Sequence, residues 1–203
     1  CEELEGLHGA DSDKCFFVPR GEGLVVTHTN TEIAPTPTST PAPTVTSTAI
    51  AAAVSVDGSS RVASGQLHAC ALLHEGSVKC WGDNSQGQLG LGDRKPRGNR
   101  DTDMGDDLPS IDLGKDRHAK SIVAGYLHTC ALLDDSSVKC WGFNNKGQLG
   151  LGDTKNRGDT DNEMGDSLPA VELGAGRHAV KITAGTHFTC AILDDGSVKC
   201  WGF

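Results

Sequence analysis

The sequence predicts an all-β protein made of repeated units, and two observations support that prediction. The first is a period of sixty residues, in which the segment Cys70–Gly82 recurs at Cys130–Gly142 and again at Cys190–Gly202. More than half of positions 62–121 agree with positions 122–181 without a gap, which chance does not produce. The second observation is that each unit consists of short apolar runs separated by glycine-rich turns, with no helical period and no helix cap.

Three short strands are expected in each repeat, and the third repeat shows them most clearly. Residues 180–184 are β-branched and alternate between apolar and polar side chains, as a strand with one buried face requires. Residues 188–193 and 198–203 are two further apolar runs. The sequence Asp-Asp-Gly at 194–196 separates them and fits a three-residue hairpin loop in which the glycine is left-handed.

Two further features of the sequence, a serine in one hairpin loop and a proline in one apolar run, each lead to a prediction. The second repeat has Ser136 at the position of the left-handed Gly196, so its turn is expected to be slightly strained. The run Leu168–Leu173 is predicted to be an edge strand, because Pro169 cannot donate a hydrogen bond to a neighbouring strand.

Several short strands in each repeat, followed by a glycine-rich connector, are typical of a propeller blade. Three motifs then carry a family resemblance: Gly125-x-x-His-Thr-Cys-Ala-Leu, Val138-Lys-Cys-Trp-Gly and Asn145-Lys-Gly-Gln-Leu-Gly-Leu-Gly-Asp. They resemble the repeat of the regulator of chromosome condensation family, over residues 62–203. The resemblance implies a β-propeller, usually with seven blades. The paired cysteines and the Arg-Gly…Met-Gly-Asp-x-Leu-Pro insertion are similar to those of its secreted or cell-surface members.

The chain is expected to divide into three parts. These are an N-terminal cysteine-containing segment (1–33), an extended Pro/Thr/Ser-rich linker (34–53) and a repeat region (54–203) with repeats at 62–121, 122–181 and 182–203. Two full repeats and part of a third cannot close a ring, so we expect either a fragment of a longer polypeptide or several chains whose blades complete one another. Apolar side chains are then expected to be exposed at the two ends: Val62, Leu72, Val78, Ile192, Leu193 and Trp201.

The cysteines predict disulfides. Each repeat contains Cys-x9-Cys across the predicted hairpin, which places the two residues opposite each other on neighbouring strands. The expected pairs are Cys70–Cys80, Cys130–Cys140 and Cys190–Cys200. Cys1 and Cys15 remain and are most simply paired with each other, although Cys1 has the alternative of a partner outside the chain. Paired cysteines predict an oxidising compartment, and therefore an extracellular or cell-surface protein.

A zinc site is the alternative interpretation of the cysteines, since His68 and His128 each lie two residues before a cysteine. The third repeat argues against it, because Phe188 occupies the equivalent position. The histidines are therefore expected to be buried core or turn residues, and no cofactor is expected.

The insertion in each repeat is acidic. Its carboxylates are Asp101, Asp103, Asp106 and Asp107 in one repeat, and Asp159, Asp161, Glu163 and Asp166 in the next. The favoured interpretation is a solvated loop held by ion pairs with Arg97, Arg100 and Arg157. Calcium binding by Asp101, Asp103, Asp106, Asp159, Asp161 and Asp166 is the alternative, although the spacing does not match an EF-hand loop. Glycosidase chemistry is disfavoured, because the same acids recur in every repeat.

A tryptophan follows the second cysteine of each unit, at Trp81, Trp141 and Trp201. Packing between blades is the expected role of a residue that recurs at one point of every repeat. The family resemblance adds the alternative of a chromophore or contact residue.

Residues 34–49 hold four prolines and eight hydroxyl side chains, and are expected to be extended because proline fixes φ and removes hydrogen-bond donors. This composition predicts an O-glycosylated stalk, with a bare flexible linker as the alternative. The candidate sites are Thr36, Thr38, Ser39, Thr40, Thr44, Thr46, Ser47 and Thr48.

Charge and hydropathy narrow the functional classes. With 27 acidic and 18 basic side chains the net charge is −9, which disfavours nucleic-acid binding, and no run is long enough to span a membrane. The leading expectation is a non-enzymatic extracellular structural or interaction protein, glycan-bearing and possessing protein partners, such as a subunit of a surface layer or filament formed from identical chains. The alternatives are a module that recognises a protein or glycan and, more remotely, a nucleotide-exchange or chromatin-binding propeller.

Overall fold

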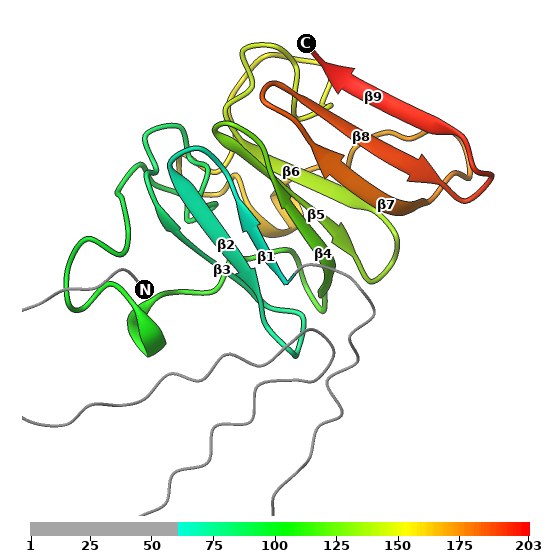
Figure 1. Ribbon diagram of the computed structural model, residues 1–203. Coiled ribbons are helices and arrows are strands. Elements are labelled where there is room, and N and C mark those ends of the chain that lie inside the picture. The colour runs from blue at the N-terminus through cyan, green and yellow to red at the C-terminus, as the bar shows by residue number, and fades with distance from the viewer. Residues whose placement is uncertain (1–60) are drawn as a thin grey trace, which may run out of the picture. The chain divides into compact units, whose positions relative to one another are not determined.

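A computed structural model describes residues 61–203, which form three antiparallel sheets standing side by side (Figure 1). The first contains β1 (Val62–Ser64), β2 (His68–Leu72) and β3 (Val78–Gly82). The second contains β4 (Ala119–Ala124), β5 (His128–Leu133) and β6 (Val138–Gly142), and the third β7 (Ala179–Ala184), β8 (Phe188–Leu193) and β9 (Val198–Gly202). The segment 1–33, the linker, Cys1, Cys15 and the eight candidate glycosylation sites lie outside the described residues.

The sheets are propeller blades, each formed by one repeat. Their first strands, β1, β4 and β7, are consecutive neighbours, so the blades follow one another in chain order. Apolar side chains fill the two spaces between blades rather than a single central core. The first space, for example, is filled by Leu72 and Val78 of one blade and by Ile122, Leu133 and Trp141 of the next.

Each blade is followed by a long excursion that carries the glycine-rich connector and then the acidic insertion. Isolated antiparallel bridges join Gly82 to Arg97 and Gly142 to Arg157, so the connector adds a minimal fourth strand to the first and second blades. The insertions contain short 3₁₀ helices, η1 (Gly105–Asp107) and η2 (Gly165–Ser167).

The predicted edge strand at Leu168–Leu173 is wrong. The segment has no strand conformation and is attached to the second blade by the Val171 N–H, which donates to the Val138 carbonyl at 2.8 Å. Because Pro169 has no N–H and Val138 is the first residue of β6, the pairing does not extend into a ladder.

The hairpin loops have the predicted conformation. Gly76 and Gly196 have φ of 86° and 81°, and Ser136 at the equivalent point of the second blade has φ of 67°. This left-handed conformation disfavours any side chain with a Cβ atom, so the strain predicted for the Ser136 turn is present.

Replacing Ser136 with glycine should therefore stabilise the protein by about 0.5–1 kcal/mol, because the left-handed strain is removed at some cost in unfolded-state entropy. The reverse change, Gly196→Ser, should destabilise it by a similar amount, since a Cβ atom at Gly196 meets nothing within 4 Å and only the backbone strain differs. Urea unfolding of both variants measures the two effects. Equal signs for the two substitutions would contradict the assignment of strain to this turn.

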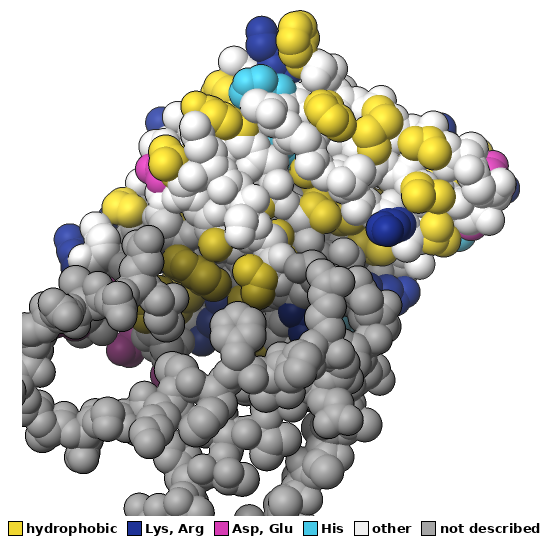
Figure 2. Space-filling view, viewed as in Figure 1, with side chains coloured by type: hydrophobic (Ala, Val, Ile, Leu, Met, Phe, Trp, Pro, Cys, Tyr) yellow, Lys and Arg dark blue, Asp and Glu magenta, His cyan; other side chains and the backbone are white. Residues whose placement is uncertain are grey.

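The exposure expected at the two ends is partly wrong. Val62 and Ile192 are exposed by 54% and 40%, but Leu72, Val78 and Leu193 are buried because they face a neighbouring blade rather than an open end. Trp201 is half-buried. The apolar side chains that are in fact exposed at the third blade include Phe188 and Val198, and Figure 2 shows hydrophobic side chains gathered over β8 and β9.

Candidate functional site

A disulfide joins the second and third strands of every described blade. Cys70–Cys80, Cys130–Cys140 and Cys190–Cys200 are directly cross-strand pairs with Cα–Cα distances of 4.0, 4.1 and 4.0 Å. The four cysteines of the first two blades are completely buried. In the third blade Cys200 is exposed and Cys190 is half-buried. The same cross-strand disulfide is therefore buried in two blades and partly exposed to solvent in the third.

A hydrogen-bonded chain of histidine and threonine joins consecutive blades. His68 Nε2 lies 2.9 Å from Thr129 Oγ1, and His128 Nε2 lies 3.0 Å from Thr189 Oγ1. Thr129 Oγ1 also donates to the Gln88 carbonyl at 2.9 Å, so its single proton is used and His68 must donate from Nε2. The expectation of buried core histidines is confirmed, and the exposed fractions are 5% for His68 and 0% for His128.

Burial holds these two histidines neutral. Desolvation lowers the pKa of His68 and of His128 from 6.5 to about 4, and the nearby Asp83 opposes the effect at His68 only in part. The His68 Nδ1 atom has no hydrogen-bond partner among residues 61–203. A proton added there would place an uncompensated charge between two blades.

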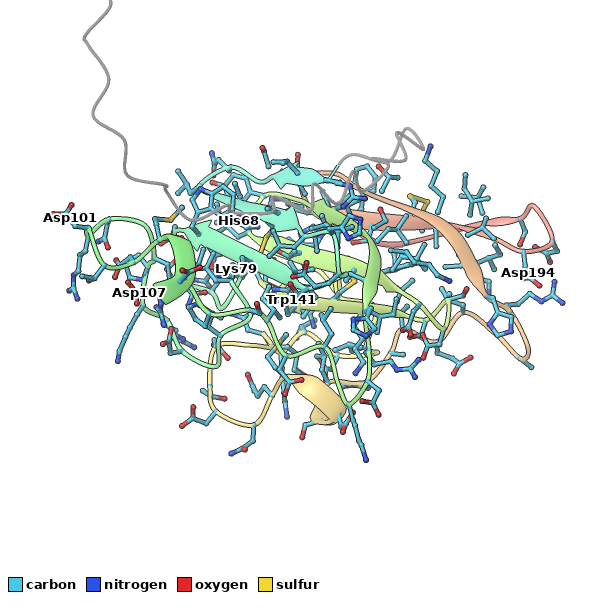
Figure 3. The ribbon with its side chains drawn as sticks, turned by 90° about the horizontal axis from the view of Figure 1, so that it is seen from below. His68, Lys79, Asp101, Asp107, Trp141 and Asp194 are labelled. Atoms are coloured by element: carbon cyan, nitrogen blue, oxygen red, sulfur yellow. A yellow bond between two sulfur atoms is a disulfide. The ribbon has the colours of Figure 1, made fainter. Side chains whose placement is uncertain are left out.

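Trp141 and Trp201 pack between blades, as predicted, whereas Trp81 of the first blade is half-buried and lies in neither space between the described blades. Trp141 is completely buried and donates its indole N–H to the Gln88 carbonyl at 3.1 Å, while Trp201 donates to the Gln148 carbonyl at 3.0 Å. The glycine-rich connector permits this contact, because a Cβ atom at Gly90 would lie 2.7 Å from Trp141 Nε1. In Figure 3, His68 and Trp141 lie within the body of the blades, and Asp101 and Asp194 at opposite ends.

One lysine joins the insertions of two blades. Lys139 Nζ donates to the Leu113 carbonyl at 3.0 Å, in the insertion after the first blade, and to the Gly165 carbonyl at 2.8 Å in its own. Burial lowers the pKa of Lys139, while Asp166 and Asp112 raise it. The lysines at the equivalent position of the other two blades make one of these bonds each: Lys79 Nζ donates to the Gly105 carbonyl and Lys199 Nζ to the Leu173 carbonyl. A lysine at this position of the repeat therefore contacts the backbone of each described insertion.

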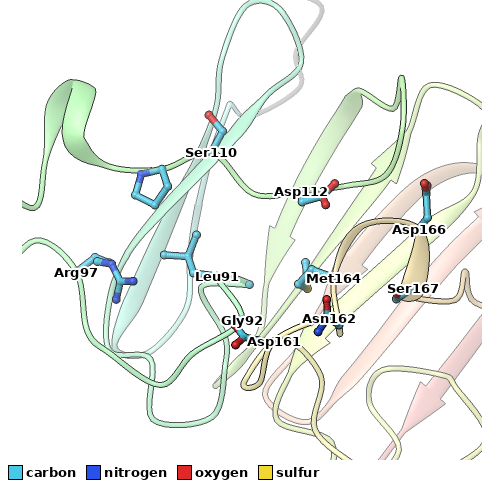
Figure 4. Close-up of a pocket in the computed structure, with 12 residues that line it drawn as sticks. Leu91, Gly92, Arg97, Ser110, Asp112, Asp161, Asn162, Met164, Asp166 and Ser167 are labelled. Carbon is cyan, nitrogen blue, oxygen red and sulfur yellow. The ribbon is translucent and has the colours of Figure 1, made fainter.

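A groove of about 430 Å³ runs between the connector of the first blade and the insertion of the second (Figure 4). Leu91 and Arg97 line one side, and Asn162 and Met164 line the other. Its carboxylates are Asp112, Asp161 and Asp166. The walls are held together by the Gly92 N–H, which donates to the Gly158 carbonyl at 3.1 Å, and by an Arg94–Asp159 ion pair.

The arginine pairing differs from the expectation. Arg97 and Arg157 bind Asp93 and Asp153 of their own connectors, each at 2.7 Å, instead of the insertion carboxylates. The residue that reaches an insertion acid is Arg94, which crosses from the first blade to Asp159 of the second.

The carboxylates weighed as calcium ligands are dispersed. Asp159 is paired with Arg94, Asp161 and Asp166 line the groove, and Asp101 and Asp106 are exposed on the first insertion, as Asp103 is in part. Within residues 61–203 no three His, Cys, Asp or Glu side chains are grouped closely enough to hold a metal ion. Apart from the buried Asp159, the insertion acids lie wholly or partly at the surface.

The groove is lined mainly by polar side chains. Its twelve lining residues include Ser110, Ser167 and the three carboxylates, but neither histidine nor cysteine. Three carboxylates against one arginine that is already paired give the groove an acidic character.

None of the helices in the described part of the chain has the length and hydropathy to cross a membrane.

Comparison with known proteins now assigns the repeats. Two matches to the regulator of chromosome condensation (RCC1) repeat cover residues 75–132 and 135–192, and a second form of the same repeat matches residues 60–88 and 119–148. The chain belongs to the RCC1 repeat family. The resemblance inferred from the three motifs is therefore confirmed. Each of the two matches at 75–132 and 135–192 contains the last strand of one blade and the first two strands of the next.

The curated proteins to which this chain is similar include a probable ubiquitin ligase and a light receptor. The chain is 34% identical over 142 residues to the probable E3 ubiquitin-protein ligase HERC3 of Homo sapiens, covering 70% of this chain and 12% of that protein. It is 36% identical over 99 residues to the ultraviolet-B receptor UVR8 of Arabidopsis thaliana, covering 48% of this chain and 20% of that receptor. The chain spans less than a third of the length of the curated relatives that it matches.

Solved structures show the same fold. Human WBSCR16 aligns with a TM-score of 0.52 at 24% identity, covering 70% of this chain and 33% of that one. Yeast RCC1 (Prp20), crystallised bound to Kap60, aligns with a TM-score of 0.51 at 21% identity, covering 70% and 31%. Both likenesses establish an RCC1-type β-propeller architecture for the described blades.

Sequence reasoning missed three functional features of these RCC1 repeats: the lysine that orients the insertions, the Arg94–Asp159 ion pair and the carbonyl of Gln88. The lysine had a signal, because it recurs in every Val-Lys-Cys-Trp-Gly motif. A backbone carbonyl leaves no signal, since any residue supplies one.

Proposed function

We propose that this RCC1-repeat chain is an extracellular or cell-surface protein with a structural and protein-interaction role, not an enzyme. The observation that carries the proposal is the disulfide in every described blade, buried completely in two of them. Disulfides persist in oxidising compartments and are rare in the cytosol and nucleus. The net charge of −9 agrees with a role that does not involve nucleic acid.

Peptide mapping of the native protein without a reductant tests the compartment. We expect Cys130 to be recovered linked to Cys140, with no free thiol on either. The intact mass should exceed the sequence mass by several sugar units, because a protein on the secretory route exposes its Thr36–Thr48 segment to glycosyltransferases. Complete alkylation of Cys130 without reductant would overturn the extracellular assignment, and an unmodified mass would leave a bare linker.

A second candidate function is recognition of a protein partner by the acidic groove between the connector of the first blade and the insertion of the second. Its exposed carboxylates Asp161 and Asp166 are suited to a basic or polar segment of another protein. Binding of lysine-rich and matched neutral peptides to the oxidised chain tests it, with Asp161→Asn/Asp166→Asn as the weakened variant. Equal binding of both peptides would exclude a charge-selective groove.

A further inference from the structure

The acidic groove is formed at an internal joint of the stack. Its lining residues come from the connector of the first blade and from the insertions after the first and second blades. The Gly92–Gly158 backbone hydrogen bond and the Arg94–Asp159 ion pair hold these segments together. The groove is therefore complete within the described blades, and its shape does not depend on either end of the stack.

The first-blade side of the groove offers apolar surface. Leu91 packs against the core between the first two blades but is only partly buried, and Pro109 is exposed. Arg97 lies on the same side (Figure 4), but its charge is offset by an ion pair with Asp93 at 2.7 Å. An apolar group of a ligand therefore finds a suitable surface on this side.

The side formed by the second insertion is acidic. Asp161 and Asp166 are exposed there, and Met164, which lies between them in the sequence, is partly buried. The third carboxylate, Asp112, comes from the first insertion and is also exposed. A purely apolar ligand would cover these carboxylates without pairing them, which costs free energy.

The cations around the groove are already bound to other groups. Arg97 pairs with Asp93, and Lys139 Nζ, whose charge lies near two of the groove carboxylates, donates to two backbone carbonyls. Within the described chain no lysine or arginine forms an ion pair with any of the three groove carboxylates. A basic group of a ligand would therefore be their first direct counter-ion.

The groove is too small for a helix. One turn of an α-helix with its side chains is a cylinder about 11 Å across and about 5.4 Å long, which occupies roughly 500 Å³. The groove has a volume of about 430 Å³. An extended segment is narrower, and its successive side chains point to opposite sides. Such a segment directs every second side chain toward Leu91 and the intervening ones toward Asp161 and Asp166.

We infer that the groove binds an extended segment of a partner protein in which apolar and basic residues alternate. The apolar side chains leave water against Leu91 and Pro109, while the basic side chains pair with Asp161 and Asp166. This inference rests on the proposed recognition of a protein by the groove, and it adds the sequence pattern that the partner carries.

Binding of two capped hexapeptides to the oxidised chain, measured by calorimetry, tests the inference. One peptide alternates leucine and lysine, and the other has the same composition arranged in two blocks. We expect the alternating peptide to bind about tenfold more tightly, because only this peptide meets both sides of the groove at once. Asp161→Asn/Asp166→Asn should weaken the binding of both peptides. Asp101→Asn/Asp106→Asn makes the same change of charge outside the groove and should leave both affinities unchanged.

Leu91→Ala and Pro109→Ser should each reduce the advantage of the alternating peptide. Pro109 is exposed, so its variant keeps the test valid if the loss of Leu91 disturbs folding. Equal affinities of the two peptides for the unsubstituted chain would overturn the alternating pattern, while the acidic groove would stand if Asp161→Asn/Asp166→Asn still weakened both. Binding of neither peptide, or affinities that do not respond to these aspartates, would overturn the proposed recognition together with the pattern.

Discussion

Acidification from pH 7 to pH 4 should destabilise the blades by about 6 kcal/mol through His68 and His128. Their pKa is about 4 in the folded chain and 6.5 when unfolded, so the unfolded chain binds more protons between these values. Stability is therefore complete above pH 6.5 and is lost as the pH falls toward 4. Each histidine accounts for about 3 kcal/mol, and the sum is comparable to the whole stability of an ordinary domain, about 5–15 kcal/mol.

Urea unfolding at pH 7, 5.5 and 4 measures this dependence. The double variant His68→Gln/His128→Gln should flatten it, since an amide can donate to the same threonines but does not titrate. A variant with glutamine at the exposed His74 and His178 serves as the control and should keep the full dependence. Carboxylates such as Asp195, whose pKa is lowered to about 2 by hydrogen bonds from Ser197, lose their contribution only below this window. A flat profile in the unsubstituted chain would refute the neutral, buried state of the two histidines.

Replacing both Cys130 and Cys140 with alanine should cost about 3–5 kcal/mol of stability. Loss of the short cross-linked loop accounts for about 3 kcal/mol in the chain-entropy treatment, and the emptied volume of two fully buried sulfur atoms adds to it. The Cys190–Cys200 disulfide closes a loop of the same length but is only partly buried, so the matched variant Cys190→Ala/Cys200→Ala should lose little more than the loop contribution.

The comparison is made in dilute solution by urea unfolding of both double variants. The difference between them isolates the value of covering a disulfide with the next blade. Equal losses for the two pairs would contradict the account, because they would make the burial of Cys130–Cys140 energetically irrelevant.

Features within one repeat could be predicted from the sequence. The strands, the left-handed hairpin residue and the cross-strand cysteine pairs depend on neighbours fewer than about fifteen positions apart, where periodicity and turn chemistry are informative. The recurrence of Trp141 and its equivalents also indicated packing between blades, because one position in every repeat meets the same surroundings.

Features that depend on the rotation between blades could not be predicted. Whether Leu72 or Val62 faces the neighbouring blade follows from the direction in which the blades stack, which no local pattern records. Arg94 reaches Asp159 across a joint for the same reason, although Arg97 is equally well placed in the sequence. The expected strand at 168–173 failed because an apolar pattern resembles a strand even where only one backbone bond forms.

The carbonyl of Gln88 accepts hydrogen bonds from Thr129 and Trp141, both of which are synthesised later than the connector that contains it. A blade emerging from the ribosome is thus unfinished until its successor has folded against it. Until the second blade is present, the Gln88 carbonyl therefore lacks both of these donors, and the face of the first blade that carries His68, Leu72 and Val78 lacks its cover.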